Sequence, residues 1–436
     1  MSSPPETPAG TGVGNPHRIV ISIALVAGFA ELAYFLVNFS AMPVYLKYKM
    51  GYGEASVTLI GAAFLICEGL MKGPFGILGD RIGRKRLILA GPLVSVATSL
   101  LTLAVQPHEW YFFVFLRVLD GLGAAALWPA ALAMIADVVP AERRSQAMSM
   151  FNVTYLIGVA LAPMIGGGAN DLARLLVPGL PDTAYYNTSF FVACGLFIAT
   201  SVVAAWGVPS LPPHHLRGGE VVEGSLSVRA LVESLRRIPQ PLLMAFITFF
   251  GIGQIMLLVK LFAMEAYGLS ETQFGAIQLV PALVIAAASI PLGTIGDRIG
   301  KARAVRWGLG LCAFSMWALI LLPNFVALII GGSLIGVGFV IAFPSWMAYI
   351  SESCEPSQRG AVMGAVGTAQ GAGAMAGAPL GGYLYEHSRL HVPFLPWIGP
   401  HYAPFIGCAA LLLAAWLLAL KTIRDTQTPR PGEQAS

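Results

Sequence analysis

The chain has 436 residues, of which 56% are hydrophobic and only 11% are charged, and its mean hydropathy is +0.73. A soluble domain usually carries about 25% charged residues, so this composition excludes an ordinary water-soluble fold and makes lipid the expected solvent. The formal net charge is only +4, which gives no sign of a nucleic-acid partner.

Long apolar runs follow one another along the chain. A helix that crosses the hydrocarbon core of a bilayer needs roughly 20 apolar residues. About twelve runs of that length are predicted to be spans: 19–46, 56–78, 87–105, 111–137, 146–167, 189–208, 241–263, 273–295, 304–322, 325–349, 360–384 and 402–420. The polar stretch 210–240 divides them six and six, and its segment 227–237 is predicted to form a short amphipathic helix on the membrane surface.

The predicted organisation has five parts. They are an N-terminal tail (1–18), a six-helix first half (19–208), a linker (209–240), a six-helix second half (241–422) and a C-terminal tail (423–436). Most Lys and Arg residues fall on a single side of the membrane, and positively charged loops stay inside. We therefore expect both tails and the linker in the cytoplasm, in a multi-pass protein of a bacterial inner (plasma) membrane.

One charged phrase occurs twice between apolar runs. GILGDRIGRKR at 76–86 is echoed by GTIGDRIGKAR at 293–303, and RVLDGLGAAALWPA at 117–130 is echoed by GSLIGVGFVIAFPS at 332–345. The second pair matches Gly121, Gly123 and Pro129 with Gly336, Gly338 and Pro344. A repeat at a nearly constant offset predicts two structurally similar six-helix halves in parallel order.

The repeated phrase resembles the loop signature of the major facilitator superfamily, G-x-x-x-D-R-x-G-R/K-R/K. The first copy matches it with Gly76, Asp80, Arg81, Gly83, Arg84 and Lys85, and the second with Gly293, Asp297, Arg298, Gly300 and Lys301. The resemblance implies an all-α membrane protein with twelve transmembrane helices in two six-helix halves, the major facilitator fold. It also implies that the two loops gate the cytoplasmic side, locking one state of the transport cycle and releasing the other.

Two further elements resemble those of the drug/proton antiporter group. Arg117, Asp120, Gly121 and Gly123 resemble the element R-x-x-Q-G-x-G, which is associated with proton coupling, with Asp120 in place of Gln. The pattern G-x-x-x-G-P-x-x-G-G is matched by Gly158, Pro163, Gly166 and Gly167, with Ala162 in place of a glycine. These residues, together with Pro379 in the second half, are expected to bend helices and to allow close packing between the halves.

Charged side chains inside the spans are costly and usually mark a transport pathway. Glu31, Arg117 and Asp120 are expected at similar depth near the membrane midplane. An ion pair of Arg117 with Glu31 or with Asp120 that breaks on protonation would act as a proton switch; the alternative is a static pair that only rigidifies the first half. Glu68 lies four residues before Lys72, which fits an ion pair near the gate as well as a coupling role. The candidates for proton coupling are Glu31, Arg117, Asp120 and Glu68.

The second half lacks the charges of the first. The counterparts of Arg117, Asp120 and Glu31 are Gly332, Ile335 and Thr248. We infer a division of labour in which the first half couples the ion and the second half mainly shapes the contacts with the solute. Lys260, near the outer end of its span, is expected to extend its ammonium group to the membrane surface.

Aromatic and amide side chains within the spans are candidates to line a substrate cavity. They are Tyr34, Asn38, Trp128, Asn152, Tyr155, Gln254, Gln278, Trp346 and Gln370. Packing or interfacial anchoring is the alternative role for such residues. A lining with few fixed charges suits hydrophobic or amphipathic solutes better than phosphates or dicarboxylates.

No nucleophilic triad or metal-ligating spacing is visible, so we expect no enzyme activity, cofactor or metal. The sequence predicts a secondary active transporter that works as a monomer in the lipid bilayer, binds no nucleic acid, and exports small hydrophobic or amphipathic molecules in exchange for protons by alternating access. One alternative is a facilitator or symporter of sugars or metabolites, or a flippase for a lipid-linked substrate. Another is a membrane sensor that transports nothing.

Overall fold

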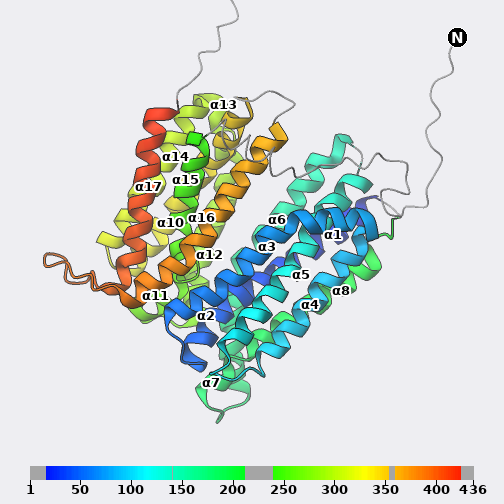
Figure 1. Cartoon of the computed structure of the whole chain (residues 1–436), viewed down its shortest axis with the longest axis horizontal. Helices are drawn as coiled ribbons and strands as arrows, with labels where there is room; N and C mark the ends of the chain where they lie inside the picture. The colour runs from blue at the N-terminus through cyan, green and yellow to red at the C-terminus, as the bar shows by residue number, and fades with distance from the viewer. Residues whose placement is uncertain (1–15, 140, 212–238, 353–358, 424–436) are drawn as a thin grey trace, which may run out of the picture. The chain divides into compact units, whose positions relative to one another are not determined.

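The computed structural model describes residues 16–139, 141–211, 239–352 and 359–423, and in these ranges the chain is helical without any β-strand (Figure 1). It divides into two compact units. Unit 1 comprises 1–38, 63–162 and 187–222, and unit 2 comprises 39–62, 163–186 and 223–436, each as far as it is described. The predicted surface helix at 227–237 and residues 424–436 of the predicted C-terminal tail lie outside the described residues.

The predicted spans of the first half are all helical. Their helices are α1 (Pro16–Phe35), α2 (Met42–Val44), α3 (Glu54–Ile82), α4 (Arg84–Thr102), α5 (Trp110–Val138), α6 (Ala141–Leu176), α7 (Asp182–Tyr185) and α8 (Thr188–Gly207). Two short π-helical segments, η1 (Leu36–Ala41) and η2 (Tyr45–Lys49), flank α2. In unit 1, α4 packs on α5 and α8, and α1 packs on α8 and α5.

The predicted spans of the second half are helical as well. Their helices are α10 (Pro239–Met256), α11 (Val259–Tyr267), α12 (Glu271–Gly293), α13 (Ile295–Ile299), α14 (Lys301–Leu321), α15 (Phe325–Glu352), α16 (Arg359–His387), the 3-10 turn η4 (Pro400–Tyr402) and α17 (Ala403–Thr422). In unit 2, α10 packs on α16 and α17, α14 packs on α15 and α17, and α12 packs on α15. The pairs α10–α17, α14–α15 and α14–α17 repeat α1–α8, α4–α5 and α4–α8.

The internal repeat extends to the helix contacts at two counterpart glycines, Gly123 and Gly338. A Cβ atom at Gly123 would lie 2.7 Å from the carbonyl oxygen of Gly91, and one at Gly338 would lie 2.7 Å from that of Gly308. Neither position can therefore hold a larger residue without moving a backbone. In both units, small residues let the two long helices approach closely, as is usual between helices in lipid.

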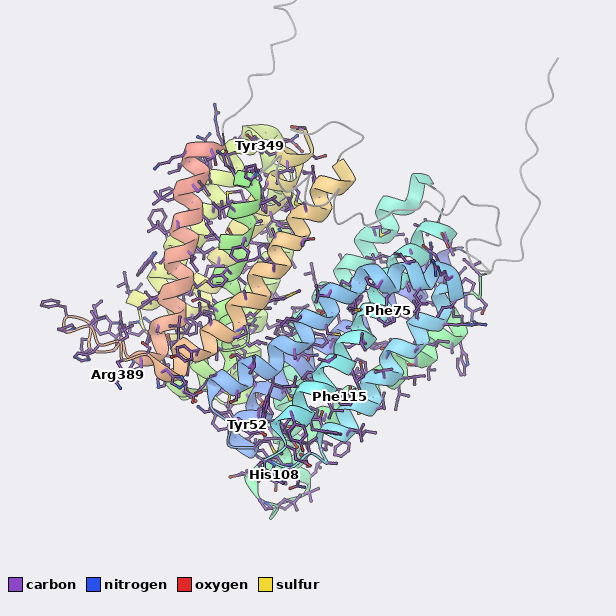
Figure 2. All side chains as sticks on the ribbon, in the orientation of Figure 1. Tyr52, Phe75, His108, Phe115, Tyr349 and Arg389 are labelled. Atoms are coloured by element: carbon purple, nitrogen blue, oxygen red, sulfur yellow. The ribbon has the colours of Figure 1, made fainter. Side chains whose placement is uncertain are left out.

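Eleven helices of the described residues are long and apolar enough to cross a membrane. The predicted span at 360–384 is the one not among them: it is helical, as α16, but its many glycines lower its hydropathy. Large apolar side chains point outward along the helices, as expected where lipid is the solvent; Phe115 on α5, for example, is 52% exposed (Figure 2).

Two predicted spans are irregular at counterpart positions. The span predicted at 19–46 changes from α1 to the π-helical segment η1, close to Pro43, which cannot donate a backbone hydrogen bond. The span predicted at 241–263 is broken at Leu257 and Leu258, between α10 and α11. Irregular turns of this kind often occur at functional sites, and they position Asn38 and Lys260.

Candidate functional site

A fully buried ion pair lies at the centre of unit 1. Arg117 Nη1 is 3.0 Å from Asp120 Oδ2, and both side chains are 0% exposed. Asn38 contacts both charges: its Oδ1 accepts from Arg117 Nη1 at 3.2 Å, and its Nδ2 donates to Asp120 Oδ2 at 3.3 Å. Thr98 donates to Asp120 Oδ1 at 3.3 Å, and Arg117 Nη2 donates to Thr102 at 3.4 Å. Every charge in this network has a partner, which a buried charge requires.

Glu31 stands apart from that network although it lies on the same face of α1. It precedes Tyr34 and Asn38 by three and seven positions, a spacing that aligns side chains on a helix. Its side chain is buried, and the hydroxyl of Tyr155 lies within hydrogen-bonding reach of the carboxyl group. Of the two pairings predicted for Arg117, the structure contains the one with Asp120.

Glu68 and Lys72 form the same-face pair that their spacing predicts, with 2.8 Å between Nζ and Oε1. Their charges act on Glu31 in opposite directions, since Glu68 repels and Lys72 attracts a negative charge at that position. The Lys72 side chain is 48% exposed, so water screens much of this attraction. Glu31 is therefore a buried acid without a close, buried cation among the described residues.

Three of the predicted cavity residues meet in an aromatic cluster of unit 1. The rings of Tyr34 and Trp128 are 6.3 Å apart, and those of Trp128 and Tyr155 are 5.5 Å apart. Phe197 packs edge-on against Tyr34 at 4.8 Å, and the hydroxyl of Ser95 donates to that of Tyr34 at 3.0 Å. The cluster adjoins Glu31 through Tyr155. It adjoins the ion pair through Asn38, whose Nδ2 donates both to the carbonyl oxygen of Tyr34 at 3.0 Å and to Asp120.

The other predicted cavity residues are dispersed. The side chain of Asn152 lies outside the described residues. In unit 2, Trp346 lines an apolar pocket, and none of the three glutamines does. Gln254 is buried with its Oε1 lacking a hydrogen-bond partner among the described residues, and Gln278 and Gln370 are partly buried.

The loop signatures form tight turns with fixed ion pairs. Gly83 and Gly300 have φ of 97° and 95°, a backbone conformation that favours glycine. In the first copy, Arg84 is 3.0 Å from Asp80 and 2.6 Å from Asp137. Lys85 Nζ donates to the carbonyl oxygen of Ala205 at 2.7 Å.

The second copy of the signature repeats this arrangement in part. Lys301, the counterpart of Arg84, pairs with Glu352, the counterpart of Asp137. Asp297 and Arg298 are exposed. The sequence suggested a solvated end charge for Asp137, which is wrong because Asp137 pairs with Arg84. Glu352 was not predicted, although the same offset that relates the glycines also relates these two acids.

The structure separates the residues predicted to pack between the halves. A Cβ atom at Gly158 would lie 2.8 Å from the backbone nitrogen of Leu32, so Gly158 packs α6 against α1 within the first half. Gly167, by contrast, packs closely on Glu271 at the start of α12. Gly166 is buried nearby, and Pro163 and Pro379 lie inside α6 and α16.

A second buried charge pair, in unit 2, was not predicted. Lys260 is 1% exposed, so the expectation that it reaches the membrane surface is wrong. Its Nζ lies 2.7 Å from Glu271 Oε2 and 2.9 Å from both the hydroxyl and the carbonyl oxygen of Ser40. Asn170 donates to Glu271 Oε1 at 2.9 Å. We call Ser40, Asn170, Lys260 and Glu271 the Lys260 cluster.

No group of three or more His, Cys, Asp or Glu residues in the described part of the chain is placed to hold a metal ion. The charged clusters consist of ion pairs with hydrogen-bond partners. Arrangements of this kind can bind or release protons and can hold helices together.

Comparison with known proteins fits this arrangement of helices and buried charges. Residues 23–263 and 241–436 match the sequence model of the Major Facilitator Superfamily. The chain belongs to this superfamily. It is thus a multi-pass integral membrane protein and a transporter of the Major Facilitator Superfamily, with the all-α fold that the repeat and the loop signatures predict.

Two curated relatives align over most of the chain. Multidrug resistance protein 2 of Bacillus subtilis (strain 168) is 25% identical over 364 residues, covering 81% of this chain and 85% of that protein. Inner membrane transport protein YajR of Escherichia coli (strain K12) is 27% identical over 400 residues, covering 89% and 80%. The crystal structure of the nucleoside transporter NupG superposes with a TM-score of 0.73 at 11% identity, covering 92% of this chain and 99% of that one, which shows the shared fold.

Proposed function

We propose that this superfamily member exports small hydrophobic or amphipathic organic solutes in exchange for protons. The observation that carries the proposal is the position of Glu31: it is a buried acid beside Tyr155 and the aromatic cluster, while the only buried cation of the described part of unit 1 is already paired with Asp120. The name of the Bacillus relative, a multidrug resistance protein, favours efflux of organic molecules.

Glu31 is the proposed site of proton binding. Burial disfavours a charged carboxylate, and an acid without a close cation can gain or lose a proton without breaking a strong ion pair. Tyr155 donates to Glu31 when the acid is ionised and can accept from it when the acid is protonated. Because Trp128 packs on Tyr155, a solute that displaces these rings changes the surroundings of the acid, which couples the two binding events.

Two ion clusters are the proposed gates of alternating access. The Arg84 pairs with Asp80 and Asp137 join the ends of α3, α4 and α5 on the predicted cytoplasmic side. The Lys260 cluster joins Ser40 and Asn170 of the first half to Lys260 and Glu271 of the second, near the predicted outer side. In this proposal, opening to the outer side separates the Lys260 cluster. The Arg84 pairs lie within the first half, and a change in them repositions the signature loop when the protein opens to the cytoplasm.

The deciding experiment uses proteoliposomes with an imposed pH gradient and a chemically diverse panel of solutes. We expect uphill export of apolar solutes by the native chain and none by Glu31→Gln, which keeps the size of the side chain but cannot ionise. Binding of the solute to Glu31→Gln should persist. Asp182→Asn is the matched control, because the Asp182 side chain is 86% exposed. Uphill export by Glu31→Gln at the native rate would overturn the proposal.

Location and assembly form part of the same proposal. The distribution of Lys and Arg favours cytoplasmic termini, and the name of the Escherichia coli relative, an inner membrane transport protein, favours a bacterial inner membrane. The proposed substrates are a small molecule and protons, and we propose that the chain works as a monomer. Transport that continues after the proton gradient is collapsed would favour a facilitator instead.

A further inference from the structure

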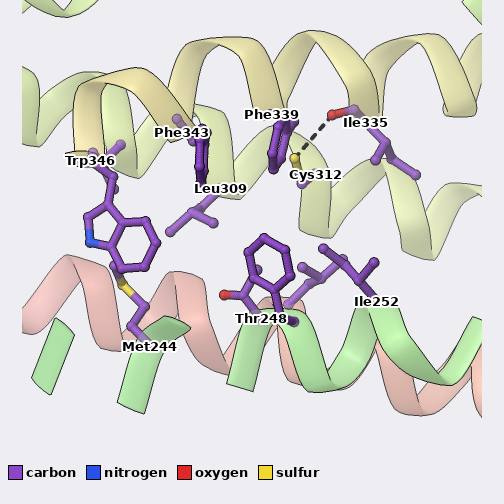
Figure 3. Close-up of a pocket in the computed structure, with 13 residues that line it drawn as sticks. Met244, Thr248, Ile252, Leu309, Cys312, Ile335, Phe339, Phe343 and Trp346 are labelled. Carbon is purple, nitrogen blue, oxygen red and sulfur yellow. Dashed lines mark hydrogen bonds between the residues drawn. The ribbon is translucent and has the colours of Figure 1, made fainter. Parts of the chain in front are cut away.

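An apolar pocket of about 70 Å³ lies inside unit 2, bounded by α10, α14, α15 and α17. Phe339 and Phe343 form one wall from α15, with stacked rings whose centroids are 5.0 Å apart. Thr248 and Ile252 face them from α10, and Cys312 closes the side formed by α14 (Figure 3). One water molecule needs roughly 10–15 Å³ of such space, so the pocket has room for a group of several non-hydrogen atoms.

The lining of this pocket contains no Asp, Glu, Lys, Arg or His. Its polar side chains are Thr248, Cys312 and Trp346, and the thiol of Cys312 already donates to the carbonyl oxygen of Ile335 at 3.3 Å. A charged group would lose its hydration here without gaining a counter-ion, which is strongly unfavourable. The pocket therefore selects for uncharged groups. The hydroxyl of Thr248 and the indole Nε1 of Trp346, which has no hydrogen-bond partner among the described residues, are the polar groups that can orient one.

The internal repeat identifies the residues of unit 1 that correspond to those around the pocket. Thr248 is the counterpart of Glu31, and Ile335 is the counterpart of Asp120. In unit 1, the corresponding region is filled by Tyr34 with its ring contacts and by the Arg117–Asp120 network. The counterpart of Tyr34 is Gly251. The second half thus has the same helix packing as the first. At the positions of Glu31, Asp120 and Tyr34, however, it has neither the charges nor the large ring.

We propose that this pocket binds a small uncharged apolar part of the exported solute, a branched alkyl group or the inner edge of an aromatic ring, with a hydrogen-bonding atom of the solute on the Thr248 hydroxyl. The aromatic wall supplies a flat surface for ring contacts. The assignment rests on the proposed function only in taking the bound group to be part of an exported molecule. It predicts that solutes are selected by an uncharged group in this half, while the proton is handled in the other.

A matched set of small probes tests the chemistry of the pocket. The full chain in lipid nanodiscs is titrated with 4-fluorobenzyl alcohol, 4-fluorobenzylamine and 4-fluorobenzoate, and fluorine NMR reports binding against empty nanodiscs. We expect saturable binding of the alcohol and at least tenfold weaker binding of the ammonium and carboxylate forms. Thr248→Val, which removes only the hydroxyl, should weaken binding of the alcohol roughly fivefold, the usual effect of one lost hydrogen bond.

A filling variant shows where the probe binds. Thr248→Phe should abolish binding of the alcohol, whereas Leu243→Phe on the same helix, at a side chain that is 50% exposed, should leave it unchanged. Unaltered binding in both Thr248 variants, or tighter binding of either charged probe, would overturn the assignment. If Thr248→Phe unfolds, the comparison of Thr248→Val with the native chain still decides.

The outcome is separable from that of the proposed function, because binding is measured without a proton gradient. If the alcohol binds as described but no solute is exported under a pH gradient, the proposed exchange is wrong and the pocket stands. If export occurs and the Thr248 variants bind the alcohol normally, the pocket assignment is wrong and the exchange stands.

Discussion

Replacing Asp120 by alanine should destabilise the protein more than any conservative change around it. The substitution leaves the Arg117 guanidinium in a site where both side chains are 0% exposed. It also removes the acceptor for Asn38 and Thr98. Breaking a buried pair by removing one partner typically costs about 3–5 kcal/mol, and Arg117 already has an Nε without a partner among the described residues. We therefore expect a loss in that range for Asp120→Ala.

The loss is measured as a shift of the thermal unfolding midpoint in nanodiscs, followed by tryptophan fluorescence. Ser99→Ala is the control, since Ser99 is buried on α4 and its Oγ has no partner among the described residues. The double variant Arg117→Met with Asp120→Leu should recover most of the stability, because no charge is then left buried and unpaired. If Asp120→Ala unfolds at the same temperature as Ser99→Ala, the network does not hold unit 1 together as argued.

Three further substitutions test the Lys260 cluster, the Arg84 ion pairs and the turn at Gly83. Lys260→Met should cost about 3–5 kcal/mol by stranding Glu271, and adding Glu271→Leu should restore most of it; equal unfolding midpoints of the single and double variants would contradict this. Arg84→Ala frees both Asp80 and Asp137, so we expect slower transport turnover with normal solute binding in proteoliposomes, and a native rate would refute the gate. Gly83→Ala should cost about 1–3 kcal/mol because of its φ of 97°. Gly168→Ala, in a helix with no atom near the added Cβ, should instead be neutral or stabilising; a loss at both positions would contradict the strain argument.

Local patterns were enough to predict most of the fold. The apolar runs correspond to helices because hydropathy and length together determine which segments cross a bilayer. The two loop signatures predicted the turns at Gly83 and Gly300, because such a turn depends on a backbone conformation that favours glycine. The break at Leu257 and Leu258 was not predicted, since that segment is uniformly apolar and nothing in its composition distinguishes a continuous span from a broken one.

Ion pairs within one helix could be predicted from the sequence, whereas ion pairs between helices could not. Glu68 and Lys72 were predictable because four residues along one helix place them side by side. The ion pair of Lys260 was not predicted, because its partner Glu271 lies on the next helix and not on the same one. The other members of the Lys260 cluster, Ser40 and Asn170, are distant in sequence. Asp137 lies between these cases: its partner is also distant, but its repetition as Glu352 was visible in the sequence.

The two halves share one helix packing but contain different chemical groups. The close approaches at Gly123 and Gly338 are the same, so the scaffold does not explain their different chemistry. A cavity of about 70 Å³ costs on the order of 1–2 kcal/mol relative to a filled core, and a buried ion pair also gives less stability than apolar side chains of similar volume would. Both halves thus retain a feature that stability alone would remove. Such costs are expected where a site serves function rather than stability, as we propose for the charge network near Glu31 in the first half and for the solute pocket in the second.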